Sequence, residues 1–511
     1  MALALSLPPF EEHTANPPET RPAHIQPWLD GMLARDVIEA AALIGDALAA
    51  TNRVALSPSR RQRLVENYYR AALSLWPKLE GHFSRATHPL TGHALAAAKA
   101  SLTLAAELAT AYKHLLAHEA GKHVLLANKR RLVELLHRCL HCTARVLVNS
   151  YLSYSPVPPR TWHDAHEVYM FARRRKLQQT PVLGDSADST PERMYVQALL
   201  LALANPYGFP PGQLAQVVLY LREHSHWAKI TDVAPVHRMA KAVAIIPLGH
   251  DFPPFSANKG GNVEGKKLFL LTFDLAFHLQ EQLRVLEAGG LPPPSVGADP
   301  ASKAQYIALL RQLLRQWAIP PTRQFNRLPS RARVLTCTGL PKVWRCSRGS
   351  RVDEGSVATS LPAMSACQII NHTPGGYALR QVDTTHAAMR IGDLIALRVD
   401  RRDALQIAMV RWIRNTLRRS GLEFGCELLT DQPEAAAARP DDAEGASFLP
   451  AIVLAGPARD GAAPMLLLPA DVFEVEHAIY LRRGNAMSTA VLTKLVEQGP
   501  GFELFEFVGI A

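Results

Sequence analysis

Residues 366–377 read ACQIINHTPGGY, an apolar run that ends in a polar turn. The Pro-Gly pair in this stretch suits the two central positions of a type II turn, which predicts a positive φ at Gly375. Asn371, His372 and Thr373 therefore stand at the end of a predicted strand, directly before the chain reverses. The stretch predicts a β-hairpin with hydrogen-bonding side chains at its tip.

Short runs of β type surround this hairpin, among them RARVLTCTGL, DLIALRV and LEFGCELL. Their alternation and the turn residues between them predict an antiparallel β-barrel over residues 321–430. The acidic stretch 431–447 is expected to be a flexible insertion. Residues 448–511 are expected to add strands that complete the C-terminal β region.

The first part of the chain has a different pattern. Residues 1–28 are Pro-rich and polar, which predicts disorder. Apolar residues recur at three and four positions over 29–288, as expected of stacked amphipathic helices, with a possible strand pair at 242–273. Residues 289–320 are predicted to form a linker and one last amphipathic helix. The fold class is therefore multidomain α + β, all-α first and β-barrel last.

Composition favours a cytoplasmic protein. The chain of 511 residues has six cysteines without framework spacing, which suits a reducing compartment. Its first residues lack the basic region of a secretory signal. No segment reaches the roughly 18 uncharged apolar residues of a membrane span, so we expect none.

The positive charge is concentrated in one place. The formal net charge is +11. Residues 323–351 contain no acidic residue and eight basic ones: Arg323, Arg327, Arg331, Arg333, Lys342, Arg345, Arg348 and Arg351. A concentrated basic segment predicts an anionic partner.

No catalytic constellation is recognisable in the sequence, and we predict no enzyme. His137 and His141 lie on one helix face beside Cys139 and Cys142, and both residue types bind zinc. Buried packing in a helical bundle is the favoured interpretation, and a metal site is the alternative. We therefore predict no metal and no cofactor.

An arginine pair four residues apart, followed by strands and a polar turn, suits an anionic guanine nucleotide. Guanidinium groups bind phosphate bidentately and stack on base planes. At the turn, Asn371 and Thr373 can hydrogen-bond a ligand, and Gly375 and Gly376 allow close backbone approach.

These residues resemble the PilZ domain family, whose signature is R-x-x-x-R followed by [D/N]-x-S-x-x-G. Arg323-Gln-Phe-Asn-Arg327 matches the first part, and Asn371-His-Thr-Pro-Gly-Gly376 resembles the second, with Thr373 where the family has serine. Arg327-Leu-Pro-Ser-Arg331 is a second possible register. The resemblance covers residues 323–427, and it implies a β-barrel that binds cyclic di-GMP.

The resemblance also implies the roles of the site residues. The arginines would hold phosphates and guanines, and the turn would hold the base and the backbone. The predicted ligand-binding residues are Arg323, Arg327, Arg331, Asn371, Thr373, Gly375 and Gly376.

The helical half resembles a protein-interaction scaffold by analogy of fold alone. We therefore expect a cyclic di-GMP receptor that signals to a protein partner through its helical domain. The alternative is a nucleic-acid-binding protein in which the basic arm and the barrel follow a phosphate backbone.

Overall fold

The computed structural model describes residues 3–510 apart from 12–16, 123–127, 183–188, 236–241, 260–263, 298, 319–324, 350–361, 383–387, 400–403, 416–420, 442–445 and 455–463. Contacts within the chain define two compact units. The helical unit comprises residues 1–86, 90–206 and 211–323, and the β unit comprises residues 87–89, 207–210 and 324–511.

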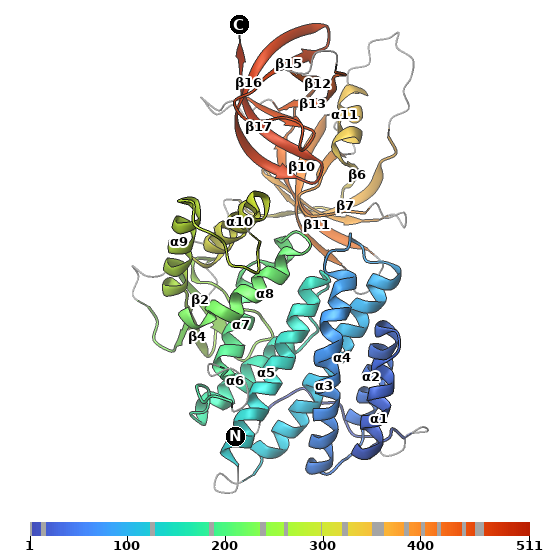
Figure 1. Ribbon diagram of the computed structural model, residues 1–511, viewed down its shortest axis with the longest axis vertical. Coiled ribbons are helices and arrows are strands. Elements are labelled where there is room, and N and C mark those ends of the chain that lie inside the picture. The colour runs from blue at the N-terminus through green and yellow to red at the C-terminus, as the bar shows by residue number, and fades with distance from the viewer. Residues whose placement is uncertain are drawn as a thin grey trace. The chain divides into compact units, whose positions relative to one another are not determined.

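The described part of the helical unit contains ten α-helices, most of which run alongside one another (Figure 1). They are α1 (Pro22–Leu33), α2 (Val37–Asn52), α3 (Pro58–Phe83), α4 (Gly92–Ala120), α5 (Lys129–Leu152), α6 (Thr161–Arg174), α7 (Pro191–Leu203), α8 (Gln213–His224), α9 (Phe273–Glu287) and α10 (Pro300–Trp317). Prolines occupy the first turn of α3, α7 and α10, where a missing N–H breaks no helical hydrogen bond.

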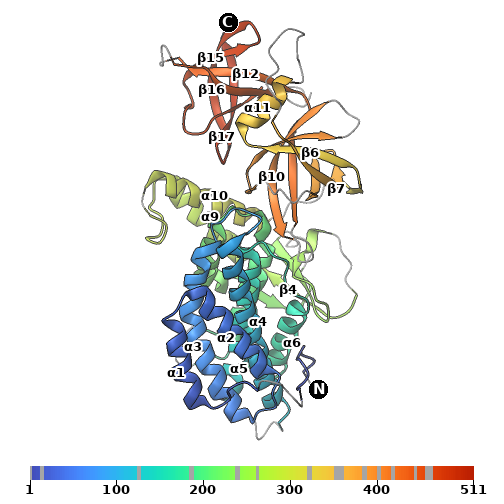
Figure 2. The ribbon, with the colours of Figure 1, turned by 90° about the vertical axis from the view of Figure 1, so that its right-hand side faces the viewer.

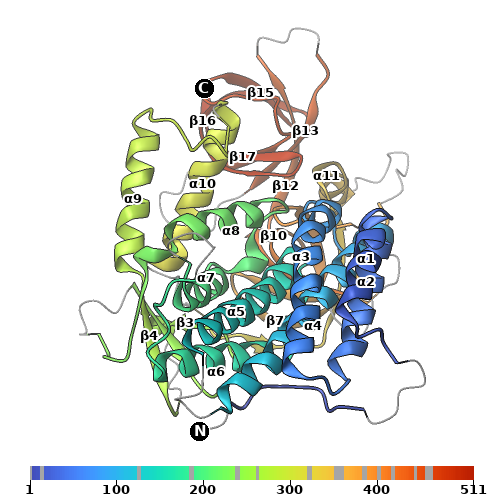
Figure 3. The same ribbon diagram turned by 60° about the horizontal axis from the view of Figure 1, so that its bottom comes forward.

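Helix α4 packs against α2, α3 and α5 (Figure 3). Small buried residues such as Ala97, Ala105 and Ala111 let its neighbours approach closely. By length and composition it is the one described helix that could cross a membrane, although the sequence predicted no such segment. Half of its most apolar window is buried inside the protein. A core helix of a bundle has the same properties, and the packing of α4 is of that kind.

A small antiparallel sheet completes the helical unit. Its strands are β1 (Lys229–Thr231), β2 (Val243–Pro247), β3 (Phe255–Ser256) and β4 (Lys267–Leu271), in the order β1-β4-β2-β3. The predicted strand pair at 242–273 is present as β2 and β4, which pair antiparallel.

The first barrel of the β unit is formed by the strands that surround the hairpin (Figure 2). The strands are β5 (Leu328–Pro329), β6 (Arg333–Thr338), β7 (Ser365–Thr373), β8 (Gly376–Gln381), β9 (Leu394–Val399), β10 (Leu405–Asn415) and β11 (Leu422–Thr430). Their order is β5-β7-β6-β9-β10-β11-β8, and the pairing of β7 with β8 closes the sheet. The predicted fold class of this region, an antiparallel β-barrel, is therefore confirmed.

The second barrel is a closed structure of its own. It contains β12 (Pro433–Pro440), β13 (Leu449–Leu454), β14 (Met465–Leu468), β15 (Ala478–Arg483), β16 (Ala486–Gly499) and β17 (Phe502–Ile510), in the order β12-β13-β14-β17-β16-β15. Residues 448–511 add the strands that the sequence predicts for the C-terminal β region, and these strands pair with one another and with β12 around a separate core that includes Leu466, Ile479 and Phe505.

Two sequence predictions need correction. The stretch 431–447 is not simply a flexible insertion, because β12 occupies residues 433–440 and pairs with both β13 and β15. The prediction of disorder over 1–28 fails where residues 3–11 lie along the helical unit and α1 begins at Pro22. In both places structure distant in the sequence supplies partners that composition does not reveal.

Helix α11 (Leu340–Gly349) joins the two barrels, and sequence analysis did not predict it. Val343 and Cys346 on this helix lie in one buried core with residues of β6, β9 and β10 and of β13, β14 and β17. Trp344 Nε1 donates a hydrogen bond of 2.6 Å to the carbonyl oxygen of Ala436 in β12. The second barrel therefore covers one side of the first, and β7 and β8 contribute no residue to this core in the described part of the chain.

A buried carboxylate lies on the other side of the first barrel. Glu423 of β11 is 8% exposed and accepts hydrogen bonds from Arg380 at 2.7 Å and Arg414 at 2.7 Å. Burial raises the pKa of the Glu423 carboxyl, but the two arginines outweigh it and hold the pKa below the ordinary 4.5.

A lowered pKa in the folded state stabilises the fold above the ordinary pKa, and this contribution is lost as the pH falls through the folded value. We expect Glu423→Gln to lose stability at neutral pH and to show a weaker decrease in the free energy of unfolding below about pH 4.5. Urea unfolding over a pH series measures both effects, and an unchanged pH dependence would contradict the assignment.

Candidate functional site

The hairpin at 366–377 is formed by β7 and β8, which are joined by Pro374 and Gly375. The predicted positive φ at Gly375 was wrong, because the positive φ falls on Gly376, at 153°. A Cβ at Gly376 would lie 2.1 Å from the backbone oxygen of Cys426 in β11, whereas one at Gly375 would meet no atom within 4 Å. Gly376 therefore lets β8 approach β11 closely, and Gly375 is the open residue of the turn.

A β-bulge at Ile370 decides which way the polar side chains of β7 face. Ile369 pairs with Leu379, and both are buried in the barrel interior. The register then shifts by one residue, so that Asn371 pairs with Ala378. Because paired residues share a face and faces alternate along a strand, Asn371 and Thr373 both lie on the outer face.

Strand β5 brings the basic arm to the same place. Leu328 pairs with His372, and Pro329 pairs with Asn371. Arg327 directly precedes Leu328 in the arm, so the same register places it beside Thr373 at the tip of the hairpin. Arg327 is exposed.

The structure brings together only part of the predicted arginine set. Arg331 is exposed and directly precedes Ala332, whose carbonyl oxygen accepts a hydrogen bond from Ile369 at 2.9 Å. Arg331 comes two residues after Pro329 in the chain, and it is therefore farther from the turn than Arg327. Arg323 lies outside the described residues.

Sequence analysis missed Trp412 of β10, which ends a row of paired residues on the outer face that begins at Asn371. Asn371 pairs with Ala378, Ala378 with Gly425, and Gly425 with Trp412. A Cβ at Gly425 would lie 1.8 Å from Trp412 Nε1, so the indole ring lies directly on this glycine. Between Asn371 and Trp412 the outer face therefore carries nothing larger than a methyl group.

Only the strand register reveals this row, since Trp412 is 41 positions from Asn371 in the sequence. The single sequence signal was a glycine inside a β-type run, FGCELL, which often marks close approach of another group.

Paired charges border this small-residue row on both sides. Arg411 binds Glu427 at 2.6 Å and also pairs with Glu497 of the second barrel. Arg380 and Arg414 bind Glu423 on the other side. These three arginines have carboxylate partners within the two barrels.

The second cluster noted in the sequence does not form a recognisable metal site. His137 Nε2 lies 2.7 Å from Ser189 Oγ, and His141 Nδ1 lies 3.0 Å from the Tyr69 hydroxyl. Burial raises the pKa of Cys139 to about 12 and lowers that of His141 to about 3. No group of three or more metal-binding side chains occurs among the described residues.

Comparison with known families agrees with this architecture. Residues 346–436 match the model of a middle PilZ domain, so the first barrel is a PilZ domain and the chain is a multidomain PilZ protein. Specifically, the chain belongs to the FimW family, since residues 23–235 match the N-terminal domain of "Cyclic-di-GMP receptor FimW" and residues 435–510 match the FimW C-terminal β-barrel domain. The family is described as a receptor and not as an enzyme. The PilZ match begins at residue 346, after the three predicted arginines.

One relative is the cyclic-di-GMP receptor FimW of Pseudomonas aeruginosa strain PAO1. It is 21% identical to this chain over 581 aligned residues, which cover 99% of this chain and 93% of that protein. The resemblance therefore extends over the helical unit and both barrels.

The two turn glycines give a matched pair of variants. We expect Gly376→Ala to lower the free energy of unfolding by about 1–3 kcal/mol, because its Cβ meets the backbone of β11. Gly375→Ala should change it by no more than about 0.5 kcal/mol, because the position is open. Urea unfolding of both variants tests the assignment, and equal losses would show that the hairpin does not pack on β11 in this way.

Proposed function

We propose that this chain binds cyclic di-GMP on the outer face of the first barrel. The observation that carries the proposal is the pairing of β5 with β7, which puts the arm beside Asn371 and Thr373 at one end of a row of small residues. The description of the FimW family and the name of its relative support the same ligand.

The chemistry of the ligand fits this surface. Cyclic di-GMP has two phosphodiester charges and two flat guanine bases. In the proposal, Arg323, Arg327 and Arg331 hold the phosphates and guanine edges, because guanidinium groups bind both in a bidentate manner. Thr373 supplies a hydroxyl where the family has serine, and Asn371 supplies an amide.

The flat part of the ligand needs an open surface. Ala378 adds only a methyl group between Asn371 and Gly425, and the indole of Trp412 covers Gly425. The half-buried indole of Trp412 ends this row and offers a stacking surface. Gly375 lies open at the turn, where its backbone is accessible to a ligand.

We further propose that binding is signalled through the helical unit to a protein partner. Helix α10 ends at Trp317, and the arm follows within a few residues along the chain. A ligand that orders the arm would therefore act on a segment continuous with α10. The ligand can shift the equilibrium between two arrangements of the arm and α10 only by the difference between its affinities for them.

The proposed receptor is cytoplasmic and is not an enzyme. None of the six cysteines forms a disulfide, and all six are buried thiols, which suits a reducing compartment.

Removal of an arm arginine should weaken binding without affecting the fold. We expect Arg323→Ala and Arg327→Ala each to raise the Kd for cyclic di-GMP about ten- to hundredfold, because each loses hydrogen bonds to a charged group. Arg345→Ala is the matched control, since this exposed arginine of the same basic segment lies on α11. Isothermal titration calorimetry measures the effect.

The same titrations decide between the two possible registers. A loss confined to Arg331→Ala would shift the motif to Arg327 and Arg331, and unchanged binding by an Arg323→Ala/Arg327→Ala double variant would contradict the site.

Salt dependence separates the proposal from nucleic-acid binding. A ligand with two charges should lose only about tenfold or less in affinity between 50 and 200 mM salt, whereas a protein that contacts six to ten phosphates of a duplex loses about 10³–10⁵. Calorimetry at both salt concentrations, with cyclic di-GMP and with a DNA duplex, provides the comparison. Tight, steeply salt-dependent binding of the duplex with no binding of cyclic di-GMP would favour the alternative.

A further inference from the structure

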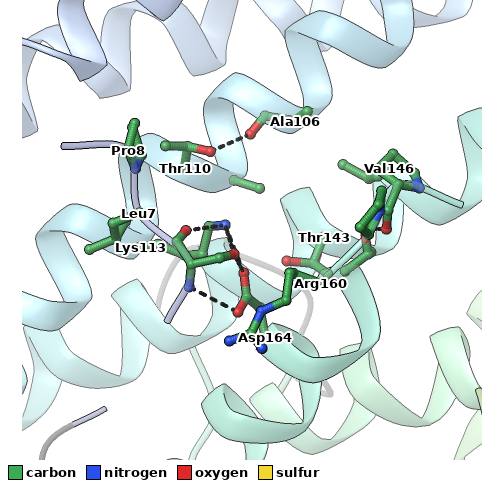
Figure 4. Close-up of a pocket in the computed structure, with 14 residues that line it drawn as sticks. Leu7, Pro8, Ala106, Thr110, Lys113, Thr143, Val146, Arg160 and Asp164 are labelled. Atoms are coloured by element: carbon green, nitrogen blue, oxygen red, sulfur yellow. Dashed lines mark hydrogen bonds and ion pairs between the residues drawn. The ribbon is translucent and has the colours of Figure 1, made fainter. Parts of the chain in front are cut away.

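The N-terminal segment Leu3–Glu11 lies along the surface of the helical unit in a non-helical conformation, and it borders a cavity of about 330 Å³. Figure 4 shows Leu7 and Pro8 of this segment beside Lys113 of α4 and Asp164 of α6. The opposite walls are formed by residues of α4 and α5 and by the Pro158–Thr161 turn. This groove is independent of the first barrel.

The backbone N–H, the hydroxyl and the carbonyl oxygen of Ser6 all bind one buried ion pair. Lys113 Nζ and Asp164 Oδ2 are 2.8 Å apart, and both residues are at least nine-tenths buried. The backbone N–H of Ser6 donates to Asp164 Oδ1 at 3.1 Å, and its hydroxyl donates to Asp164 Oδ2. Its carbonyl oxygen accepts from Lys113 Nζ at 2.9 Å.

Two more contacts follow along the segment. The ring of Phe10 stacks on His114 with centroids 5.1 Å apart, and the Arg61 guanidinium lies 5.7 Å from the centroid of the Phe10 ring. Burial, with the charges of Arg61 and Lys113, lowers the pKa of His114 to about 4, so the stacked imidazole is neutral at physiological pH. Glu11 donates its backbone N–H to Arg53 at 2.8 Å.

The segment is held by these contacts and not by burial in a core. Every residue from Leu3 to Glu11 is half-buried or exposed, and the side chain of Phe10 is 51% exposed. Lys113 and Asp164 also bind each other directly, so their ion pair is not made through Ser6. A segment with few buried apolar contacts opens at low free-energy cost.

We propose that this groove is a peptide-binding site, occupied in cis by residues 3–11 and able to accept a segment of the same kind from a protein partner. The partner segment is extended, and its sequence is a serine, an aliphatic residue, two prolines and an aromatic residue, as in Ser6-Leu-Pro-Pro-Phe10. Lys113 and Asp164 bind the hydroxyl and the backbone of this serine. The prolines keep the peptide extended, which lowers the entropy lost on binding.

The test uses the full chain with its own segment released. Ser6→Pro removes both the N–H and the hydroxyl that bind Asp164, while proline keeps the backbone extended. Ala4→Pro is the matched control, because Ala4 is exposed on the same segment. The probe is a fluorescein-labelled peptide with the sequence of residues 3–11, and fluorescence anisotropy measures its binding.

We expect the peptide to bind the Ser6→Pro chain at least tenfold more tightly than it binds the wild-type chain or the Ala4→Pro chain. The same peptide with alanine in place of its serine should bind the Ser6→Pro chain about ten- to hundredfold more weakly, because it lacks the hydrogen bond to a charged group. This comparison changes only the probe, so protein folding does not affect it.

Several results would overturn the proposal. They are no binding of the peptide to the Ser6→Pro chain, equal binding of the serine and alanine peptides, or unchanged hydrogen exchange of residues 3–11 in Ser6→Pro. Wild-type dimers that the peptide dissociates, seen by light scattering, would assign the groove to a second copy of this chain and not to a partner.

Discussion

The register of β7 is the constraint on which the candidate site depends. Ladder pairing to β8 on one side and to β5 and β6 on the other leaves this strand no freedom to slide. The bulge at Ile370 then reverses the alternation of its last residues, because one extra residue is accommodated on β7. Without it, Asn371 and Thr373 would face the barrel interior, and the arm would meet a surface without these polar groups.

The two faces of the first barrel have different partners. The outer side of β6, β9 and β10 packs with α11 and the second barrel around Val343, Ile407 and Leu467. The outer side of β7, β8 and β11 carries small residues bordered by paired charges. The apolar surface that a neighbouring domain covers stabilises the fold, whereas the row of small residues lies between Asn371 at one end and the indole of Trp412 at the other.

The helical unit also holds a polar feature inside an otherwise apolar bundle. The pair of Lys113 and Asp164 is buried between α4 and α6, where an unpaired charge would be expensive. Ser6 satisfies much of the remaining hydrogen-bonding capacity of this pair. The N-terminal segment therefore adds polar complementarity to the bundle, and Phe10 adds an aromatic contact at its edge.

The sequence by itself determined the order of α and β regions, the hairpin at 366–377 and the basic arm, because these follow from periodicity, turn chemistry and charge within short windows. Only the tertiary structure decided that Gly376 and not Gly375 is the constrained glycine, that Trp412 and Asn371 end one row of paired residues, and that the last strands close a second barrel. Each of these depends on pairing between strands far apart in the chain, and a one-residue shift in pairing reverses every side chain that follows. Local sequence patterns carry no information about such a shift, and the packed backbone does.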